Sequence, residues 1–159
     1  MSQKNCANML KAILLLAAAA VAAIYFVLAP HIAVKVVRNY PEYIYAFWPW
    51  LGYVLLSCIP VFWAFADAWA IFSRIGLDRS FCPENVRSMR RISILAAAES
   101  IYLMAGNIVL SLFVVNHPGI FLFFTVLAFL ALIACGVCAA LSMLIRKAST
   151  LQEENDLTI

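Results

Sequence analysis

Two acidic residues lie inside long apolar runs of the sequence, where an ionisable side chain is costly and therefore informative. Asp67 lies six residues before Ser73, and Glu99 lies six residues after Ser93, the serines that mark one end of each run. A helix rises about 1.5 Å per residue, so both carboxyls are expected roughly 9 Å inside that end. Two carboxyls that meet at one depth cannot both ionise easily, which is the chemistry of a proton-sharing pair or a cation site.

A structural interpretation of these residues stays open beside the chemical one. A charged side chain in a membrane helix costs about 2.5 to 3.5 kcal/mol on insertion scales, so it is usually paired, protonated or turned toward water. In this interpretation Asp67 forms an ion pair with Arg74 or Arg91. Glu99 then forms hydrogen bonds across the helices, with Asn107 two turns away as its partner. The candidate intramembrane polar site therefore comprises Asp67, Glu99 and Asn107.

Other reactive residue types form no recognisable catalytic or metal-binding pattern. Cys135 and Cys138 have the spacing of a redox pair, but a thiol in apolar surroundings has little thiolate with which to react. The two histidines, His31 and His117, form no cluster with cysteine or acidic residues, and no glycine-rich phosphate loop occurs. We therefore expect no enzymatic activity, no catalytic residue, no metal and no cofactor.

Four long apolar runs must position the candidate residues. Hydrophobic residues make up 66% of the chain and charged residues only 12%, against roughly 25% charged in soluble domains. Each run reaches about 18 residues or more, enough for a helix to cross the hydrocarbon layer. The sequence predicts an all-α integral membrane four-helix bundle formed by a single domain, residues 1–159. Its helices are expected at about 10–29, 46–73, 83–115 and 119–148.

The basic residues indicate how the chain crosses the membrane. Nine of the eleven Lys and Arg residues fall near the N-terminus, near the central loop 74–82 or at the end of the fourth run. Only Lys35 and Arg38 fall on the other side, so both termini and the loop are expected in the cytoplasm. A helix from Pro83 to Val115 is about 50 Å long, so its first turns are expected to extend into the cytoplasm.

The outer segment, residues 30–45, is rich in tyrosine, whose amphipathic ring suits the headgroup layer. We expect an aromatic belt there, with a ligand-binding outer lip as the alternative. In the fourth run Ala131, Ala134 and Gly136 would let another helix approach closely. That helix can belong to the same chain or to a second copy, so a homo-oligomer stays open.

Charged residues of both signs gather on the expected cytoplasmic side. The loop and the start of the third helix carry Arg79, Arg87, Arg90 and Arg91, and the tail, residues 149–159, carries Glu153, Glu154 and Asp156. The arginines suit either anionic lipid or a cytoplasmic partner. The acidic tail suits either these arginines or a basic partner.

Four short phrases of the sequence are distinctive when taken together. They are Tyr40-Pro41-Glu42-Tyr43, Ile59-Pro60-Val61-Phe62-Trp63, Phe81-Cys82-Pro83-Glu84-Asn85-Val86 and the terminal Glu154-Asn155-Asp156-Leu157-Thr158-Ile159. The chain from about residue 10 onward resembles the YoaS-like family of small bacterial four-helix membrane proteins of unknown function. It departs from that family at Cys82, where a serine cap is usual and a thiol caps more weakly.

The resemblance implies a location in the bacterial inner membrane and no established activity. Members of the family are often encoded beside a small helix-turn-helix regulator, which implies such a regulator as a partner and no direct contact with nucleic acid. We therefore expect a non-enzymatic membrane regulator or scaffold that binds a partner through its cytoplasmic loop and tail, surrounded by membrane lipids. The alternative is a small oligomeric proton-coupled transporter or channel that uses Asp67 and Glu99.

Overall fold

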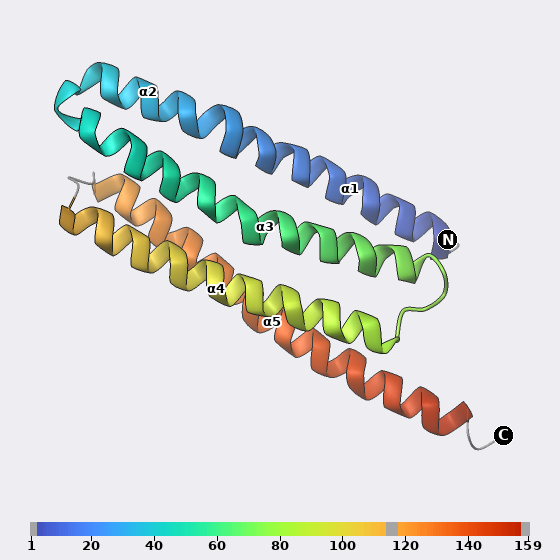
Figure 1. Cartoon of the computed structure of the whole chain (residues 1–159). Coiled ribbons are helices and arrows are strands. Elements are labelled where there is room, and N and C mark those ends of the chain that lie inside the picture. Colours follow the sequence, from blue (N-terminus) through green and yellow to red (C-terminus); the bar gives the residue numbers. More distant parts are fainter. Residues whose placement is uncertain (1–2, 114–117, 157–159) are drawn as a thin grey trace.

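The computed structural model describes residues 3–113 and 118–156, with side chains as far as residue 151 (Figure 1). The first helical stretch comprises α1 (Gln3–Ala23), a π-helical turn (Ile24–Leu28) and α2 (Ala29–Asn39). A 3-10 turn (Pro41–Ala46) leads into α3 (Phe47–Ile75), and α4 (Pro83–Phe113) and α5 (Pro118–Asp156) follow. Proline opens both α4 and α5, because its fixed backbone angle suits the first helical position and it has no N–H to leave unpaired.

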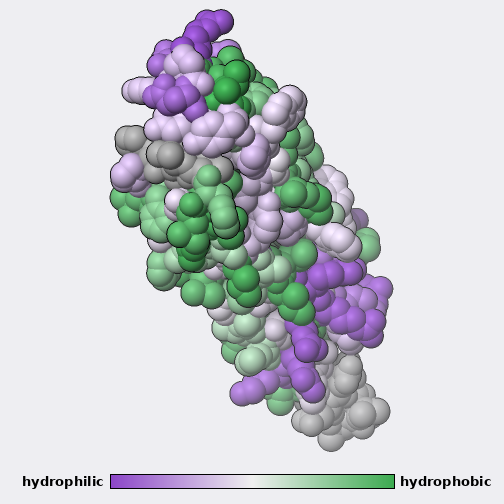
Figure 2. All heavy atoms as spheres, turned by 60° about the vertical axis from the view of Figure 1, so that its left-hand side comes forward, coloured by the Kyte–Doolittle hydropathy of each residue, from purple (hydrophilic) through white to green (hydrophobic). Residues whose placement is uncertain are grey.

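Four helical stretches are long and apolar enough to cross a membrane, namely Gln3–Asn39, Pro41–Ile75, Pro83–Phe113 and Pro118–Leu151. This finding confirms the predicted all-α architecture with four spans. Figure 2 shows hydrophilic residues gathered toward the two ends of the molecule, with hydrophobic and weakly polar residues between them. Such a distribution is typical of a protein whose middle lies in lipid and whose ends lie in water.

Several predicted boundaries differ from the structure, and the first helix begins at Gln3 rather than near residue 10. The outer segment 30–45 is helical, since α2 continues to Asn39 and the 3-10 turn follows it, and the tail 149–159 is helical as far as Asp156. Residues 31–39 and 149–156 contain no glycine or proline, so nothing in them stops a helix that has already formed. The expected end of the third helix at Val115 lies outside the described residues.

The four spans lie in an open row rather than in a closed bundle (Figure 1). Each helix packs against its neighbour in the chain, α1 against α3, α3 against α4 and α4 against α5, with the most extensive packing between α4 and α5. Among the described residues, the backbone of α5 approaches neither α1 nor α3. Both termini lie at the end that holds the α3–α4 loop, residues 76–82, and this end is called the loop end below.

Reciprocal hydrogen bonds from two tyrosines join α3 to α4. The Tyr53 hydroxyl donates to the carbonyl of Leu103 at 2.7 Å, and the Tyr102 hydroxyl donates to the carbonyl of Tyr53 at 2.9 Å. The two rings stack with their centroids 5.3 Å apart, and Phe124 of α5 packs edge-on against Tyr53 at 5.2 Å. A phenol in hydrocarbon must find an acceptor within the protein, so these bonds help to fix how α3 and α4 are aligned.

Hydrogen bonds at regular steps align α4 with α5. Side chains of α4 donate to backbone carbonyls of α5 at three levels, Ser93 to Cys135 at 3.0 Å, Ser100 to Ala128 at 2.8 Å and Asn107 to Phe121 at 2.9 Å. Both series advance by seven residues, so the antiparallel pair keeps one register over four turns. This register places Pro83 level with Ile145, and α5 therefore continues beyond the start of α4.

We expect Gly106→Ala to destabilise the protein, because a Cβ atom at Gly106 would overlap the ring of Tyr53. The ring cannot turn away without losing its hydrogen bond to Leu103, so the free energy of unfolding should fall by about 1–3 kcal/mol. Reversible unfolding in mixed micelles measures this quantity. The matched control is Gly52→Ala on α3, where an added Cβ meets nothing within 4 Å. Equal stability of the two variants would contradict this prediction.

Candidate functional site

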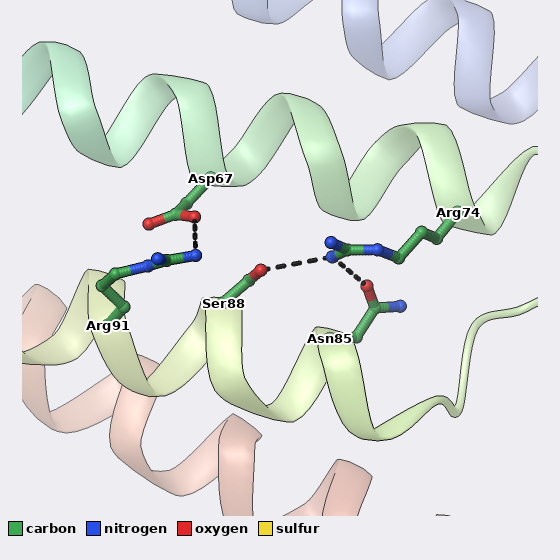
Figure 3. A network of polar contacts seen from close by, with 5 residues as sticks. All are labelled: Asp67, Arg74, Asn85, Ser88 and Arg91. Carbon is green, nitrogen blue, oxygen red and sulfur yellow. Dashed lines mark hydrogen bonds and ion pairs between the residues drawn. The ribbon is translucent and has the colours of Figure 1, made fainter.

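Five polar side chains form a network at the loop end, between the last turns of α3 and the first turns of α4 (Figure 3). Arg91 of α4 donates to Asp67 Oδ1 of α3 at 2.7 Å, which makes an ion pair. Arg74 reaches in the opposite direction, from α3 to α4, and donates to Asn85 Oδ1 at 3.1 Å and to Ser88 Oγ at 3.2 Å. Each helix therefore sends one guanidinium group to polar atoms of the other.

Asn85 also fixes the α3–α4 loop. Its side-chain Nδ2 donates to the carbonyls of Arg79 at 3.2 Å and of Ser80 at 2.9 Å, and the residue is only 1% exposed. α3 ends at Ile75, and three residues later Asp78 adopts a left-handed backbone conformation with φ of 58°. The N–H of Arg79 then bonds to the carbonyl of Arg74 at 3.0 Å, as in a Schellman motif. One buried amide thus connects the loop to both helices.

The structure separates the two carboxyls that the sequence placed at one depth. Asp67 is paired with Arg91, whereas the Glu99 carboxyl interacts with Ser57, which lies ten residues from Asp67 along α3. At 1.5 Å per residue this distance is about 15 Å along the helix. The prediction measured the depth of Glu99 from Ser93, but the contacts of Arg74 place the end of α3 beside the first two turns of α4. The carboxyls therefore do not form the expected pair.

The structural interpretation fits Asp67 better, but it is wrong about Glu99, whose side-chain partner is Ser57 and not Asn107. Its ion pair between Asp67 and Arg91 is confirmed, with Asp67 at 6% exposure and the Arg91 side chain half exposed. Asn107 is fully buried and donates to the carbonyl of Phe121 and, at 3.3 Å, to Thr125 Oγ1, so its amide connects α4 to α5. Glu99 Oε2 is buried and has no hydrogen-bond partner.

The predicted basic residues are exposed at the loop end. Arg79, Arg87 and Arg90 have exposed side chains, and no ion pair involves them within the described part of the chain. Arg91 belongs to the same surface but is committed to Asp67. The predicted acidic residues Glu153, Glu154 and Asp156 lie on the last turns of α5, and their side chains are outside the described residues.

The contacts of Arg74 with Asn85 and Ser88 are absent from the sequence prediction. The sequence singled out Arg74 only as an alternative partner of Asp67. Asn85 and Ser88 are three residues apart, so they share one face of α4, and a polar pair on a buried face was the available signal. In residues 3–113 and 118–151, no three His, Cys, Asp or Glu side chains come together as a metal site, and all five cysteines are free.

We expect Asn85→Ala to lower the free energy of unfolding by about 1–3 kcal/mol, since it removes the amide from two loop carbonyls and from Arg74. The loop should also lose protection, which amide hydrogen exchange at residues 77–82 measures. Arg87→Ala is the control, because Arg87 is exposed on the same helix and should change stability by less than about 0.5 kcal/mol. Unchanged exchange in the Asn85 variant would show that the amide does not hold the loop.

Arg91→Gln should destabilise the protein more than Arg90→Gln, because only Arg91 neutralises a buried carboxylate. Half of the Arg91 side chain is exposed, so water offsets part of the cost and we expect a difference of about 1–2 kcal/mol. Adding Asp67→Asn should recover most of the loss, since the uncompensated charge is then gone. Additive effects of the two substitutions in this double-mutant cycle would rule out a stabilising pair.

Comparison with known proteins supports the resemblance noted from the sequence. The chain is 28% identical over 152 residues to the "Uncharacterized membrane protein YoaS" of Bacillus subtilis (strain 168), covering 94% of this chain and 95% of that protein. No solved structure matches the chain. A family model described as "Protein of unknown function (DUF2975)" matches residues 32–159. Since this match covers most of the chain, the protein belongs to the DUF2975 family of proteins of unknown function.

Proposed function

We propose that the protein is a non-enzymatic regulator or scaffold of the bacterial inner membrane, which binds a partner protein at its loop end. In this proposal the loop end faces the cytoplasm. The exposed arginines Arg79, Arg87 and Arg90, called the basic surface below, and the acidic last turns of α5 form the binding region. The resemblance to YoaS-like proteins implies a small helix-turn-helix regulator as the partner, which the membrane protein would hold away from DNA or release.

The observation that carries the proposal is the unequal distribution of charge between the two ends. In the described residues seven basic side chains are exposed at the loop end, Lys4, Arg79, Arg87, Arg90, Arg91, Arg146 and Lys147. At the opposite end, Lys35 and Arg38 are the exposed Lys and Arg side chains among the described residues, and Glu42 offsets part of their charge. Basic residues are normally retained on the cytoplasmic side of a membrane, which supports placing the loop end there.

The surface is also well anchored, which favours specific binding over a loose attraction. Asn85 holds the loop carbonyls, and the ion pair of Arg91 with Asp67 joins the start of α4 to α3. A surface whose backbone is fixed loses less conformational entropy when a partner binds. Anionic lipid headgroups would be attracted to the same arginines, so the test must separate lipid from protein.

The test uses the intact protein in nanodiscs of uncharged lipid and the purified regulator encoded beside its gene. We expect binding that weakens at least about tenfold when Arg79, Arg87 and Arg90 are all changed to Gln, or when residues 149–159 are deleted. The matched control changes Lys35 and Arg38 to Gln at the opposite end and should bind normally. If the intact protein does not bind the regulator, the proposed partner is wrong. If the basic variants lose only their preference for anionic lipid, the arginines are membrane anchors.

A second candidate function is a small oligomeric proton-coupled transporter or channel. The observation that favours it is Glu99, which is buried within α4 and has one carboxyl oxygen without a partner. Asp67 is neutralised by Arg91, so the proposed proton transport depends on Glu99 and not on Asp67. In liposomes with a pH gradient, proton flux that disappears in Glu99→Gln and persists in Arg87→Gln would support transport. Wild-type protein without any flux would exclude it.

A further inference from the structure

A group of polar side chains lies in the apolar part of the row, away from the network at the loop end. Tyr25, Ser57 and Glu99 come from three different helical elements and meet there. The Tyr25 hydroxyl is 2.8 Å from Ser57 Oγ, and the Ser57 hydroxyl lies 3.0 Å from the carbonyl of Val54, to which it donates. The Glu99 carboxyl interacts with the same serine. Ser57 is 3% exposed and Glu99 is 6% exposed, so the group is shielded from water.

Tyr25 belongs to the π-helical turn Ile24–Leu28 between α1 and α2, where the N–H of Ala29 bonds to the carbonyl of Ile24. A π-helical turn is rare, and it frequently lies at a functional site. Here the wider turn includes the tyrosine that reaches Ser57. The irregular backbone and the polar contact therefore coincide.

The number of hydrogens available for hydrogen bonds among Tyr25, Ser57 and Glu99 depends on whether the Glu99 carboxyl is protonated. A serine hydroxyl has one hydrogen to donate and two lone pairs that accept. If Ser57 donates to Val54 and accepts from Tyr25, as the distances allow, its remaining lone pair can accept a hydrogen but Ser57 has none left to donate. A protonated Glu99 supplies that hydrogen, and the serine is then fully satisfied. An ionised Glu99 would instead need the hydrogen that Ser57 gives to Val54.

Among the described residues, no cation acts on the Glu99 carboxyl. The titratable groups that interact with it electrostatically include the phenols of Tyr25, Tyr53 and Tyr102. Cys58 of α3 lies near Tyr25, and α5, which packs on α4, carries only the thiols Cys135 and Cys138 before its basic end. No ion pair of Glu99 occurs in residues 3–113 and 118–151. A carboxylate without a cation inside a span is costly, and protonation removes that cost.

We propose that Glu99, Ser57 and Tyr25 form a proton-binding site within the membrane, in which protonated Glu99 donates its hydrogen to Ser57. The ligand is a proton, which forms an O–H bond with a carboxylate oxygen of Glu99. When the proton leaves, the Ser57 hydroxyl turns from Val54 to the carboxylate, while Tyr25 keeps its contact with the serine oxygen. The site is separate from the basic surface. It deepens the second candidate function and in that respect rests on it, although binding of the proton does not itself require transport.

Infrared spectroscopy of the full-length protein in nanodiscs tests the proposal, because a protonated carboxyl has a C=O stretching band that a carboxylate lacks. We expect one such band from a buried group near neutral pH, and we expect Glu99→Gln to abolish it. Asp67→Asn is the control and should leave the band in place, because Asp67 is already ion-paired. Ser57→Ala should shift the frequency of the band, since the O–H of Glu99 loses its acceptor.

Labelling the wild-type protein with ¹³C-glutamate keeps the test independent of whether Glu99→Gln folds. A carboxyl band that shifts with the label comes from glutamate, and its change in Ser57→Ala then assigns it to Glu99. A spectrum without any label-sensitive protonated carboxyl between about pH 5 and pH 8 would overturn the proposal. A band that is insensitive to both Glu99→Gln and Ser57→Ala would overturn it equally. If the band is present while the liposomes show no flux, the site stands and the transporter is excluded.

Discussion

The alignment of α3 with α4 depends on polar groups that cannot reach water. Tyr53 and Tyr102 each donate across the interface to a backbone carbonyl of the opposite helix, and lipid offers these hydroxyls no other acceptor. Once these bonds fix the register, Arg91 comes level with Asp67 at the loop end and Glu99 comes level with Ser57. A shift of one residue along either helix would break the whole series. Both candidate sites are therefore consequences of one interface.

The two outer spans of the row are held by different kinds of contact. α5 keeps a uniform register with α4 through side-chain donors two turns apart, whereas the backbone of α1 packs only on α3. The described contacts of the first span include Ala7 against Gly76, Lys11 over the ring of Trp69 at 5.1 Å and the bond of Tyr25 to Ser57. The first span is thus joined to the row by packing along α3 and by the bond of Tyr25 to Ser57. The proton site lies at its contact with the rest of the row.

Sequence reasoning succeeds here where length and composition decide the outcome. Runs of apolar residues predict four spans, which the structure contains. The sequence also offers Arg74 or Arg91 as the ion-pair partner of Asp67, and the structure shows that Arg91 is the partner. It fails where the outcome depends on the relative position of two helices. The expected depth of Glu99 is counted from Ser93, yet the end of α3 and the start of α4 lie at different levels. No residue in either apolar run indicates how far the two helices are shifted relative to each other. The π-helical turn at Tyr25 cannot be predicted from the sequence either, because its residues are as apolar as those on either side.

An open row of four apolar helices would be unstable in water, yet it can be stable in a bilayer. Only 6 to 22% of the residues in the most apolar window of each span are buried by the protein. Lipid chains cover the remaining apolar surface as well as another helix would, so no hydrophobic penalty drives the row to close.

Association then depends on close packing and on hydrogen bonds between helices, and a polar side chain inside a span has a large effect on which helices meet. For this reason Glu99, with one carboxyl oxygen left without a partner, is difficult to explain as structural support alone. Asp67 also leaves one oxygen without a partner, but Arg91 neutralises its charge, whereas no ion pair of Glu99 occurs in residues 3–113 and 118–151.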